Sequence, residues 1–279
     1  MATETLVSTT ANGSTVQSGP LTQADVEFYR ENGFLRIPEV FTPAESQALA
    51  DDLDRLAREW ATVDKRWTGP WRKVYMDEET EKTASLEAMH ELSCYSQPWL
   101  AAVTNPKLVA CLVQLLGPDI ELHHSVMHNK PPGGQPFPMH QDHPFYPHDD
   151  GRYADVLIHL DDTCHDNGEI RFLAGSHKQG PLPHILGTEE EPSAPHLPTD
   201  QYRLADSVAV PAKRGDVVVF SYYTVHGSYI NATDRTRRMV RVGYRHPHNG
   251  QHQGVNTGAP GIMVAGYRER RGDEPLLNR

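Results

Sequence analysis

The sequence predicts a mainly β protein in which N-terminal helices pack on a β-sandwich or jelly-roll core. Helical signals, namely capping residues followed by apolar stripes, are concentrated in the first 117 residues. After residue 119 the glycine, proline and histidine content rises, and short β-rich runs alternate with turn residues. A chain of 279 residues is long enough to build this arrangement as one domain with a buried core.

Two of the expected helices have a start and a stop signal in the sequence. The first follows Thr22, which stands three residues before Asp25 as in a capping box, and it stops at Gly33. The other opens at Asn105-Pro106, continues as the apolar run "KLVACLVQLL" and stops at Gly117. Between the first helix and the next, "FLRIPEVF" alternates as a short strand does.

A further helix is expected after Thr42. This residue supplies a hydroxyl N-cap, Pro43 fits the first helical position, and Glu45 completes a capping box. The apolar stripe of this helix, which would face the core, consists of Leu49, Leu53, Leu56 and Trp60.

The β core is expected from six short runs that turn residues separate. These runs are "IELHHSVMHN", "ADVLIHL", "EIRFLAG", "SVAVPA", "DVVVFSYY" and "RRMVRVGYR". Residues 178–207 interrupt the series with a long stretch that has little regular pattern. Because loops of that length often close over a binding site, we expect a lid or insertion there, within a single domain spanning residues 21–279.

Composition restricts the partners and the compartment. The formal net charge of −11 argues against binding to nucleic acid or to an anionic membrane surface. Cys94, Cys111 and Cys164 are sparse, odd in number and form no CxxC pair, which is typical of a reduced, cytoplasmic protein. Residues 1–20 are rich in Ser, Thr and Gly, lack the features of a secretory signal, and are expected to be disordered.

The stretch "PMHQDHPF" contains the strongest signal for chemistry. His140 and Asp142 stand two residues apart, so on an extended strand both side chains would point to one face. His226 follows the apolar run that ends at Tyr223, where a side chain can project into a jelly-roll interior. Two histidines and one carboxylate form the facial triad of non-haem Fe(II) oxygenases, which leaves coordination positions open.

Arg237 is the candidate for holding a second, organic reactant. It stands eleven residues after His226, at the start of the next strand, and a buried guanidinium can bind a carboxylate through a bidentate pair. A diacid that chelates iron at one end and meets this arginine at the other fits 2-oxoglutarate. Arg238 is the alternative, although alternation turns it to the opposite face.

Several segments of the sequence resemble a known family. The segments "NKPPGGQPFPMHQDHPFYP", "IHLDDTCHDNGEIRFLAGSHKQGPL" and "RGDVVVFSYYTVHGSYINATDRTRR" are similar to the phytanoyl-CoA dioxygenase family of Fe(II)/2-oxoglutarate oxygenases. The resemblance begins near residue 20 with "ENGFLRIPEVFTPAE" and extends to about residue 246. HxD alone is weak, but these motifs in this order are a specific signal.

The resemblance implies a fold, a set of reactants and a set of site residues. The fold is a double-stranded β-helix, a jelly roll of the cupin type, flanked by helices. The reactants are Fe(II), 2-oxoglutarate, O2 and a small-molecule substrate. The implied iron ligands are His140, Asp142 and His226, and the implied 2-oxoglutarate contacts are Arg237, Ser228, Val126 and Leu157.

The resemblance also implies a reaction. Oxidative decarboxylation of 2-oxoglutarate to succinate and CO2 would drive hydroxylation of an unactivated C–H bond, with the cofactor supplying the chemistry. Asp142 argues against halogenation, because halogenating relatives replace this ligand with a small residue. Desaturation, ring formation and endoperoxide formation remain alternatives, and the substrate is expected to be a free metabolite, such as a natural-product intermediate.

Five further residues are candidates for the substrate pocket, each with packing as the competing interpretation. His159 shares a strand face with Leu157, and Arg241 shares one with Arg237, where it could meet a substrate acid group. The other three candidates are Gln141, the middle residue of the HxD motif, His128 on the preceding strand, and Trp71 in the segment linking two helices.

Two other classes of function compete with the oxygenase. A non-catalytic jelly-roll module that binds a ligand would have no need of Arg237 at this spacing from the triad. A zinc hydrolase could use the same three ligands, since zinc also accepts His and Asp, but it would need a general base and would not depend on 2-oxoglutarate.

Overall fold

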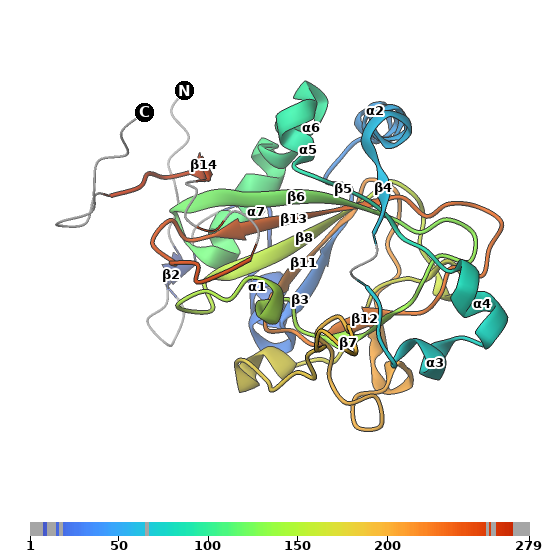
Figure 1. Ribbon diagram of the computed structural model, residues 1–279. Helices are drawn as coiled ribbons and strands as arrows, with labels where there is room; N and C mark the ends of the chain where they lie inside the picture. Colours follow the sequence, from blue (N-terminus) through green and yellow to red (C-terminus); the bar gives the residue numbers. More distant parts are fainter. Residues whose placement is uncertain are drawn as a thin grey trace.

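The computed structural model describes residues 8–9, 15–16, 19–64, 67–254, 257 and 261–269. Two sheets face each other to form a jelly roll, so the predicted fold class is confirmed (Figure 1). The large sheet has the order β3-β11-β8-β13-β6-β5-β4, with β14 also paired to β6, and the small sheet has the order β10-β9-β12-β7. All strand pairs in both sheets are antiparallel.

The strands of the large sheet follow the predicted runs and add two short edge strands and a late one. Their bounds are β3 Phe34–Ile37, β4 Thr62–Val63, β5 Glu87–His90, β6 Ile120–Asn129, β8 Tyr153–His159, β11 Val217–Ser221, β13 Met239–Arg245 and β14 Ile262–Ala265. The small sheet comprises β7 Phe137–His140, β9 Arg171–Phe172, β10 Val208–Ala209 and β12 His226–Ser228.

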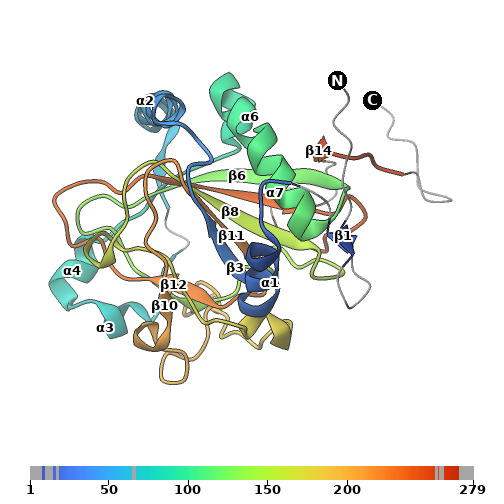
Figure 2. The ribbon, with the colours of Figure 1, turned by 180° about the vertical axis from the view of Figure 1, so that it is seen from behind.

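Helices cover the outer face of the large sheet and leave its inner face to the small sheet (Figure 1). From behind, α6 and α7 run one after the other across this outer face, and α1 lies beside α7 (Figure 2). The helices are α1 Gln23–Asn32, α2 Pro43–Trp60, α3 Arg72–Tyr75, α4 Glu78–Thr83, α5 Leu92–Tyr95, α6 Gln97–Val103 and α7 Pro106–Leu116.

The capping signals set the helix starts as expected. Thr22 and Thr42 each accept a hydrogen bond from the backbone N–H three residues on and complete a capping box, and Asn105 caps α7. One expectation about α2 is wrong. Only the three leucines of its apolar stripe are buried in the core. Trp60, at the last helical position, is 54% exposed and packs against Tyr95 at the surface.

Leu53 offers a test of this packing. It is completely buried in the cluster between α2 and the sheet, so Leu53→Ala should lower the free energy of unfolding by about 2–5 kcal/mol. Trp60→Ala, on the same helix but exposed, should change it by less than about 1 kcal/mol. Urea denaturation measures both values, and equal losses would contradict the burial pattern.

Strand alternation gives the large sheet two different faces. Val156, Ile158, Val240 and Val242 point outward into the helix-covered core. The residues between them on β8 and β13 point inward, and this inner face carries most of the buried polar groups of the sheet. Among these are His124, His128, Asp155, His159, Arg241 and Arg245.

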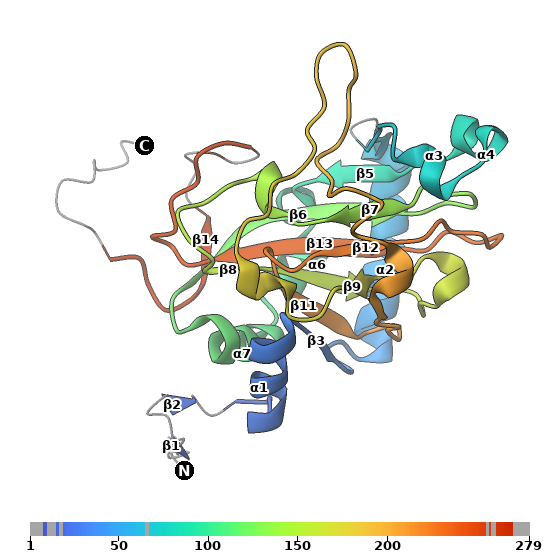
Figure 3. The same ribbon diagram turned by 90° about the horizontal axis from the view of Figure 1, so that it is seen from below.

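Residues 178–207 form a long excursion, as expected, which carries short 3-10 turns at both ends, Ser176–Gln179 and Leu204–Asp206. In the view from below, it extends well beyond the body of the molecule as a yellow-orange loop (Figure 3). Its returning part is fixed, because the Leu197 N–H donates to the Met139 carbonyl at 2.9 Å and the Ala194 N–H donates to the Thr68 carbonyl at 2.7 Å. The excursion is therefore a cover attached to strand β7 as well as to the segment before α3.

Two other expectations concern the ends and membranes. The tail 1–20 lies largely outside the described residues, apart from β1 (Ser8–Thr9) and β2 (Thr15–Val16), which pair with each other, and from its last two residues. One described stretch, Gln97–Leu116, is long and apolar enough to cross a membrane by length and composition alone. Core helices pass the same test, and here α6 and α7 contribute Trp99, Val103 and Leu112 to the main core.

Candidate metal centre

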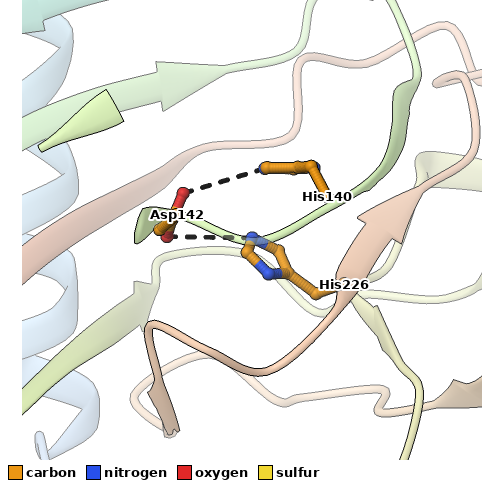
Figure 4. Close-up of side chains that lie close together, drawn as sticks. All are labelled: His140, Asp142 and His226. Carbon is orange, nitrogen blue, oxygen red and sulfur yellow. Dashed lines mark ion pairs between the residues drawn. The ribbon is translucent and has the colours of Figure 1, made fainter. Parts of the chain in front are cut away.

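Three potential metal ligands converge between the two sheets (Figure 4). His140 ends β7 and His226 begins β12, and the two residues are directly opposite each other in the antiparallel ladder. Asp142 lies between the imidazoles, with Oδ1 3.7 Å from Nε2 of His140 and Oδ2 3.8 Å from Nε2 of His226. One donor atom from each residue falls within 4.8 Å of the others, a spacing that could hold one ion.

Both imidazoles are oriented by the backbone. Nδ1 of His140 donates to the Pro138 carbonyl at 2.7 Å, and Nδ1 of His226 donates to the Thr224 carbonyl at 2.9 Å. This leaves each Nε2 as the unprotonated donor that faces Asp142. Burial lowers the pKa of both imidazoles, so both are neutral and able to bind a metal at neutral pH.

We had expected Asp142 to lie on an extended strand. It reaches the site through a turn instead. Strand β7 ends at His140, and Asp142 has helical dihedrals (φ −76°, ψ −22°) at the start of the 3-10 turn that contains Pro144. Burial alone would raise the pKa of the Asp142 carboxyl, but the positive charge of the Arg241 guanidinium opposes burial, and the pKa is lowered. The carboxylate is therefore ionised at neutral pH, as a metal ligand must be.

A second group of buried basic side chains lies further along the inner face. Arg237 and Lys130 are bridge partners at the ends of β13 and β6, and Nζ of Lys130 donates to Ser228 Oγ at 2.6 Å. No carboxylate among the described residues pairs with Arg237, whose Nη1 contacts only the sulfur of Met239 at 3.0 Å. Burial lowers the pKa of Arg237 to about 10, as expected for a guanidinium that lacks a counter-ion.

The triad lines a narrow hollow of about 30 Å³ between the sheets. Two of the five predicted pocket residues, His128 and Arg241, line it, and so does Leu157, which was predicted as a 2-oxoglutarate contact. Its remaining lining is mostly apolar or aromatic and includes Trp67, Phe137, Ile170, Phe220 and Met239. A reaction space of this composition excludes water while leaving the three ligand atoms accessible.

The other predicted residues take different places. Val126 is buried opposite Arg241 in the β6–β13 register, and His159 lies opposite Met239 with both ring nitrogens unpartnered among the described residues. Like His159, two more predicted pocket residues lie outside the hollow. The Gln141 amide binds Gly180, Leu182 and Tyr223 in the loops behind the triad, and Trp71 is buried with Nε1 donating to the Thr68 carbonyl.

Comparison with known proteins identifies the family. Residues 29–239, about three quarters of the chain, match the model of the family described as phytanoyl-CoA dioxygenase (PhyH). The chain belongs to the phytanoyl-CoA dioxygenase family. Its curated relatives include the dioxygenase lolE1 of Epichloe uncinata, 28% identical over 77% of this chain and 79% of the relative, and the ectoine dioxygenase of Bordetella bronchiseptica, 26% identical over 82% and 77%.

Solved structures of the same fold agree with this assignment. The non-heme alpha-ketoglutarate-dependent carbocyclase SnoK from nogalamycin biosynthesis superposes with a TM-score of 0.68 at 21% identity, covering 89% of this chain and 95% of SnoK. EctD from S. alaskensis with 2-oxoglutarate and 5-hydroxyectoine superposes with a TM-score of 0.65 at 20% identity, covering 93% and 87%. The predicted family and enzyme class, an iron- and 2-oxoglutarate-dependent dioxygenase, are confirmed.

The residues of this PhyH-family chain fit both implied reactants. Two neutral Nε2 atoms and an ionised carboxylate are a donor set that Fe(II) accepts, and they leave other positions open. The unpaired guanidinium of Arg237, with Lys130 beside it, is a cationic end point for a dianionic co-substrate. The structure adds Lys130, which the sequence analysis missed although it stands two and four residues after His128 and Val126 on the same alternating face.

The buried histidines of this PhyH-family chain predict sensitivity to acid. Burial lowers the pKa of His123 and of His159 from 6.5 to about 3, so below pH 6.5 only the unfolded chain takes up these protons. The free energy of unfolding should therefore fall as the pH drops from 6.5, by about 1.4 kcal/mol per pH unit for each such histidine. Urea denaturation at pH 7.5 and 5.5 measures this fall in the free energy of unfolding. In His159→Leu the fall should be smaller by the contribution of one histidine. A stability independent of pH over this range would contradict the burial of neutral imidazoles.

Proposed function

We propose that His140, Asp142 and His226 bind Fe(II), and that Arg237 and Lys130 hold the distal carboxylate of 2-oxoglutarate. In this proposal the chain hydroxylates an unactivated C–H bond of a small molecule and releases succinate and CO2. One observation carries the assignment: Met239, which lines the hollow beside the buried His-Asp-His cluster, also contacts the unpaired buried guanidinium of Arg237 through its sulfur at 3.0 Å.

Each charged group has a defined task in this arrangement. The bound iron and dioxygen supply the oxidising chemistry. Arg237 supplies a bidentate pair to a carboxylate, and Lys130 adds an amine donor that Ser228 Oγ holds in place. The charge of Arg237 balances negative charge that burial of the co-substrate would otherwise leave uncompensated.

The apolar surroundings support the positioning of both reactants. Trp67 stands edge-on to His140, with ring centroids 4.9 Å apart, and packs on Phe137 and Phe145. The Ala194 backbone is hydrogen-bonded to Thr68, next to this tryptophan, so the excursion of residues 178–207 and the segment before α3 cover the triad together. A covered, apolar site would keep water away from the reacting C–H bond.

The names of the relatives support a small substrate. Relatives are named for small molecules, among them ectoine, hypophosphite and methylphosphonate, and SnoK is described as an enzyme from nogalamycin biosynthesis. We propose a free metabolite in the cytoplasm, with a natural-product intermediate as the first class to screen.

Two competing functions account for fewer of the observations. A binding module does not explain an ionised carboxylate and two neutral imidazoles arranged around one point. A zinc hydrolase does not explain a buried guanidinium, Arg237, that lacks a carboxylate partner among the described residues. The oxygenase accounts for both features with one set of reactants.

Succinate release tests the proposal without knowledge of the substrate. We expect slow, substrate-independent formation of succinate from 2-oxoglutarate that needs both Fe(II) and O2 and stops when Zn(II) replaces Fe(II). Candidate metabolites are then screened for acceleration of this rate and for a gain of one oxygen atom. Succinate formation that persists without iron, or none in folded protein that has bound iron, would count against the oxygenase.

A further inference from the structure

Arg241 contacts the candidate metal ligand Asp142 directly. Its Nη1 lies 3.0 Å from Asp142 Oδ2 and 3.3 Å from Asp155 Oδ1, and it also donates to the Tyr146 hydroxyl. Tyr146 in turn donates to Asp155 Oδ2 at 3.0 Å, and the guanidinium carbon of Arg241 lies 5.4 Å from its ring centroid. The four side chains form a closed network in which Asp142, Tyr146 and Asp155 are almost completely buried.

The network comes from three separate parts of the chain. Arg241 lies on β13 and Asp155 on β8, the neighbouring strand, while Asp142 and Tyr146 flank the 3-10 turn after β7. A buried guanidinium next to a buried carboxylate offsets the cost of burying either charge alone. Its position is therefore fixed by partners on both sides, unlike that of Arg237, which has no carboxylate partner among the described residues.

The contact has a consequence for how the carboxylate can bind a metal. An octahedral ion needs two positions for the histidines, two for a chelating 2-oxo acid and one for dioxygen, so only one position remains for Asp142. A carboxylate that binds through both oxygens would take the position needed by dioxygen. Arg241 engages Oδ2 and leaves Oδ1, which faces His140, for the ion.

We propose that Arg241 is a positioning residue that restricts Asp142 to one-oxygen ligation and so keeps a coordination position open for dioxygen. Tyr146 and Asp155 hold Arg241 in this role. The assignment rests on the proposed function of the triad, and it replaces the earlier expectation that Arg241 meets a substrate acid group. The Nη1 group of Arg241 is directed at Asp142, Asp155 and the Tyr146 hydroxyl.

The test compares two arginines on the same strand. Arg241→Gln removes the charge next to Asp142, whereas Arg245→Gln removes one from an equally buried pair with Glu121, whose Oε1 lies 2.5 Å from Arg245 Nε. Arg241→Gln should weaken anaerobic Fe(II) binding by about 10- to 100-fold, as expected for loss of a partner that orients a ligand. It should also raise the KM for O2 while leaving the KM for 2-oxoglutarate unchanged. Arg245→Gln should leave all three values unchanged.

Coordination number gives a readout that a purely structural role would not alter. Near-infrared magnetic circular dichroism of the anaerobic Fe(II)–2-oxoglutarate complex should show one open position fewer in Arg241→Gln than in the native protein. Tyr146→Phe keeps the ring and removes one hydrogen bond to Arg241. It should weaken Fe(II) binding less than Arg241→Gln does. If Arg241→Gln does not fold, Tyr146→Phe replaces it in the test.

The outcomes separate this proposal from the proposed function. Native protein that binds no Fe(II) would overturn both. Native protein that binds Fe(II) and 2-oxoglutarate, together with an Arg241→Gln variant of unchanged iron affinity and coordination number, would overturn only the role of Arg241. A rise confined to the KM for 2-oxoglutarate or for the substrate would likewise overturn it, because it would make Arg241 a contact for that reactant.

Discussion

Replacing His226 by alanine should reduce iron-dependent succinate formation to background. His226 supplies one of three donor atoms that lie within 4.8 Å of one another, and its Nε2 is kept free by the hydrogen bond from Nδ1 to Thr224. The remaining pair, His140 and Asp142, would hold Fe(II) too weakly to retain it in dilute protein. The rate of succinate release and the iron retained after gel filtration measure the two losses.

The control for this variant is another histidine that is hydrogen-bonded to the backbone. His177 contacts the Arg30 carbonyl at 3.1 Å and lies outside the hollow that contains the triad. His177→Ala should keep both iron and activity. Full activity in a folded His226→Ala protein would contradict the assignment of the ligands.

Replacing Arg237 by alanine should raise the KM for 2-oxoglutarate by about a hundredfold or more, since loss of one partner of a buried charge pair costs on the order of 3 kcal/mol. The effect should be specific to the co-substrate, because Arg237 lies at the far end of Met239 and Leu157 from the triad. Iron affinity in the absence of 2-oxoglutarate should therefore remain unchanged. Lys130→Met should raise the same KM, and steady-state kinetics at varied 2-oxoglutarate measures both variants.

The neighbouring arginine provides the matched control. Arg238 points to the other face of β13, where it forms ion pairs with Asp161 and Asp54 at 2.7 and 2.9 Å. Arg238→Ala should affect stability and leave the KM for 2-oxoglutarate unchanged. A larger rise in KM for Arg238→Ala than for Arg237→Ala would reverse the assignment of the clamp.

Local spacing explains why much of the fold could be predicted. Three helices begin at N-cap residues that contact the backbone within three positions, namely Thr22, Thr42 and Asn105. Because these contacts are local, the sequence alone predicts where the helices begin. The HxD motif and the histidine after an apolar strand are equally local, and their order along the chain resembled one family. Trp60 shows the limit, since the periodic stripe does not reveal that the last turn of α2 extends past the edge of the core.

The residues that were missed depend on register between distant strands. Lys130 meets Arg237 only because β6 and β13 pair in one particular register, which no local pattern specifies. The contact of Arg241 with Asp155 likewise depends on the β8–β13 register. The contact of Arg241 with Asp142 depends on the turn after β7. Gln141 was misplaced because its neighbours His140 and Asp142 suggested the pocket, while its amide is bound by the loops around Gly180 and Tyr223.

The most direct test of the central claim is the visible spectrum of the anaerobic protein with Fe(II) and 2-oxoglutarate. If the triad holds iron and Arg237 orients the co-substrate on it, a weak metal-to-ligand charge-transfer band should develop on addition of 2-oxoglutarate. The band should be absent in His140→Ala and should need much more 2-oxoglutarate in Arg237→Ala. No band in folded native protein, or a band of equal strength in His140→Ala, would contradict the account.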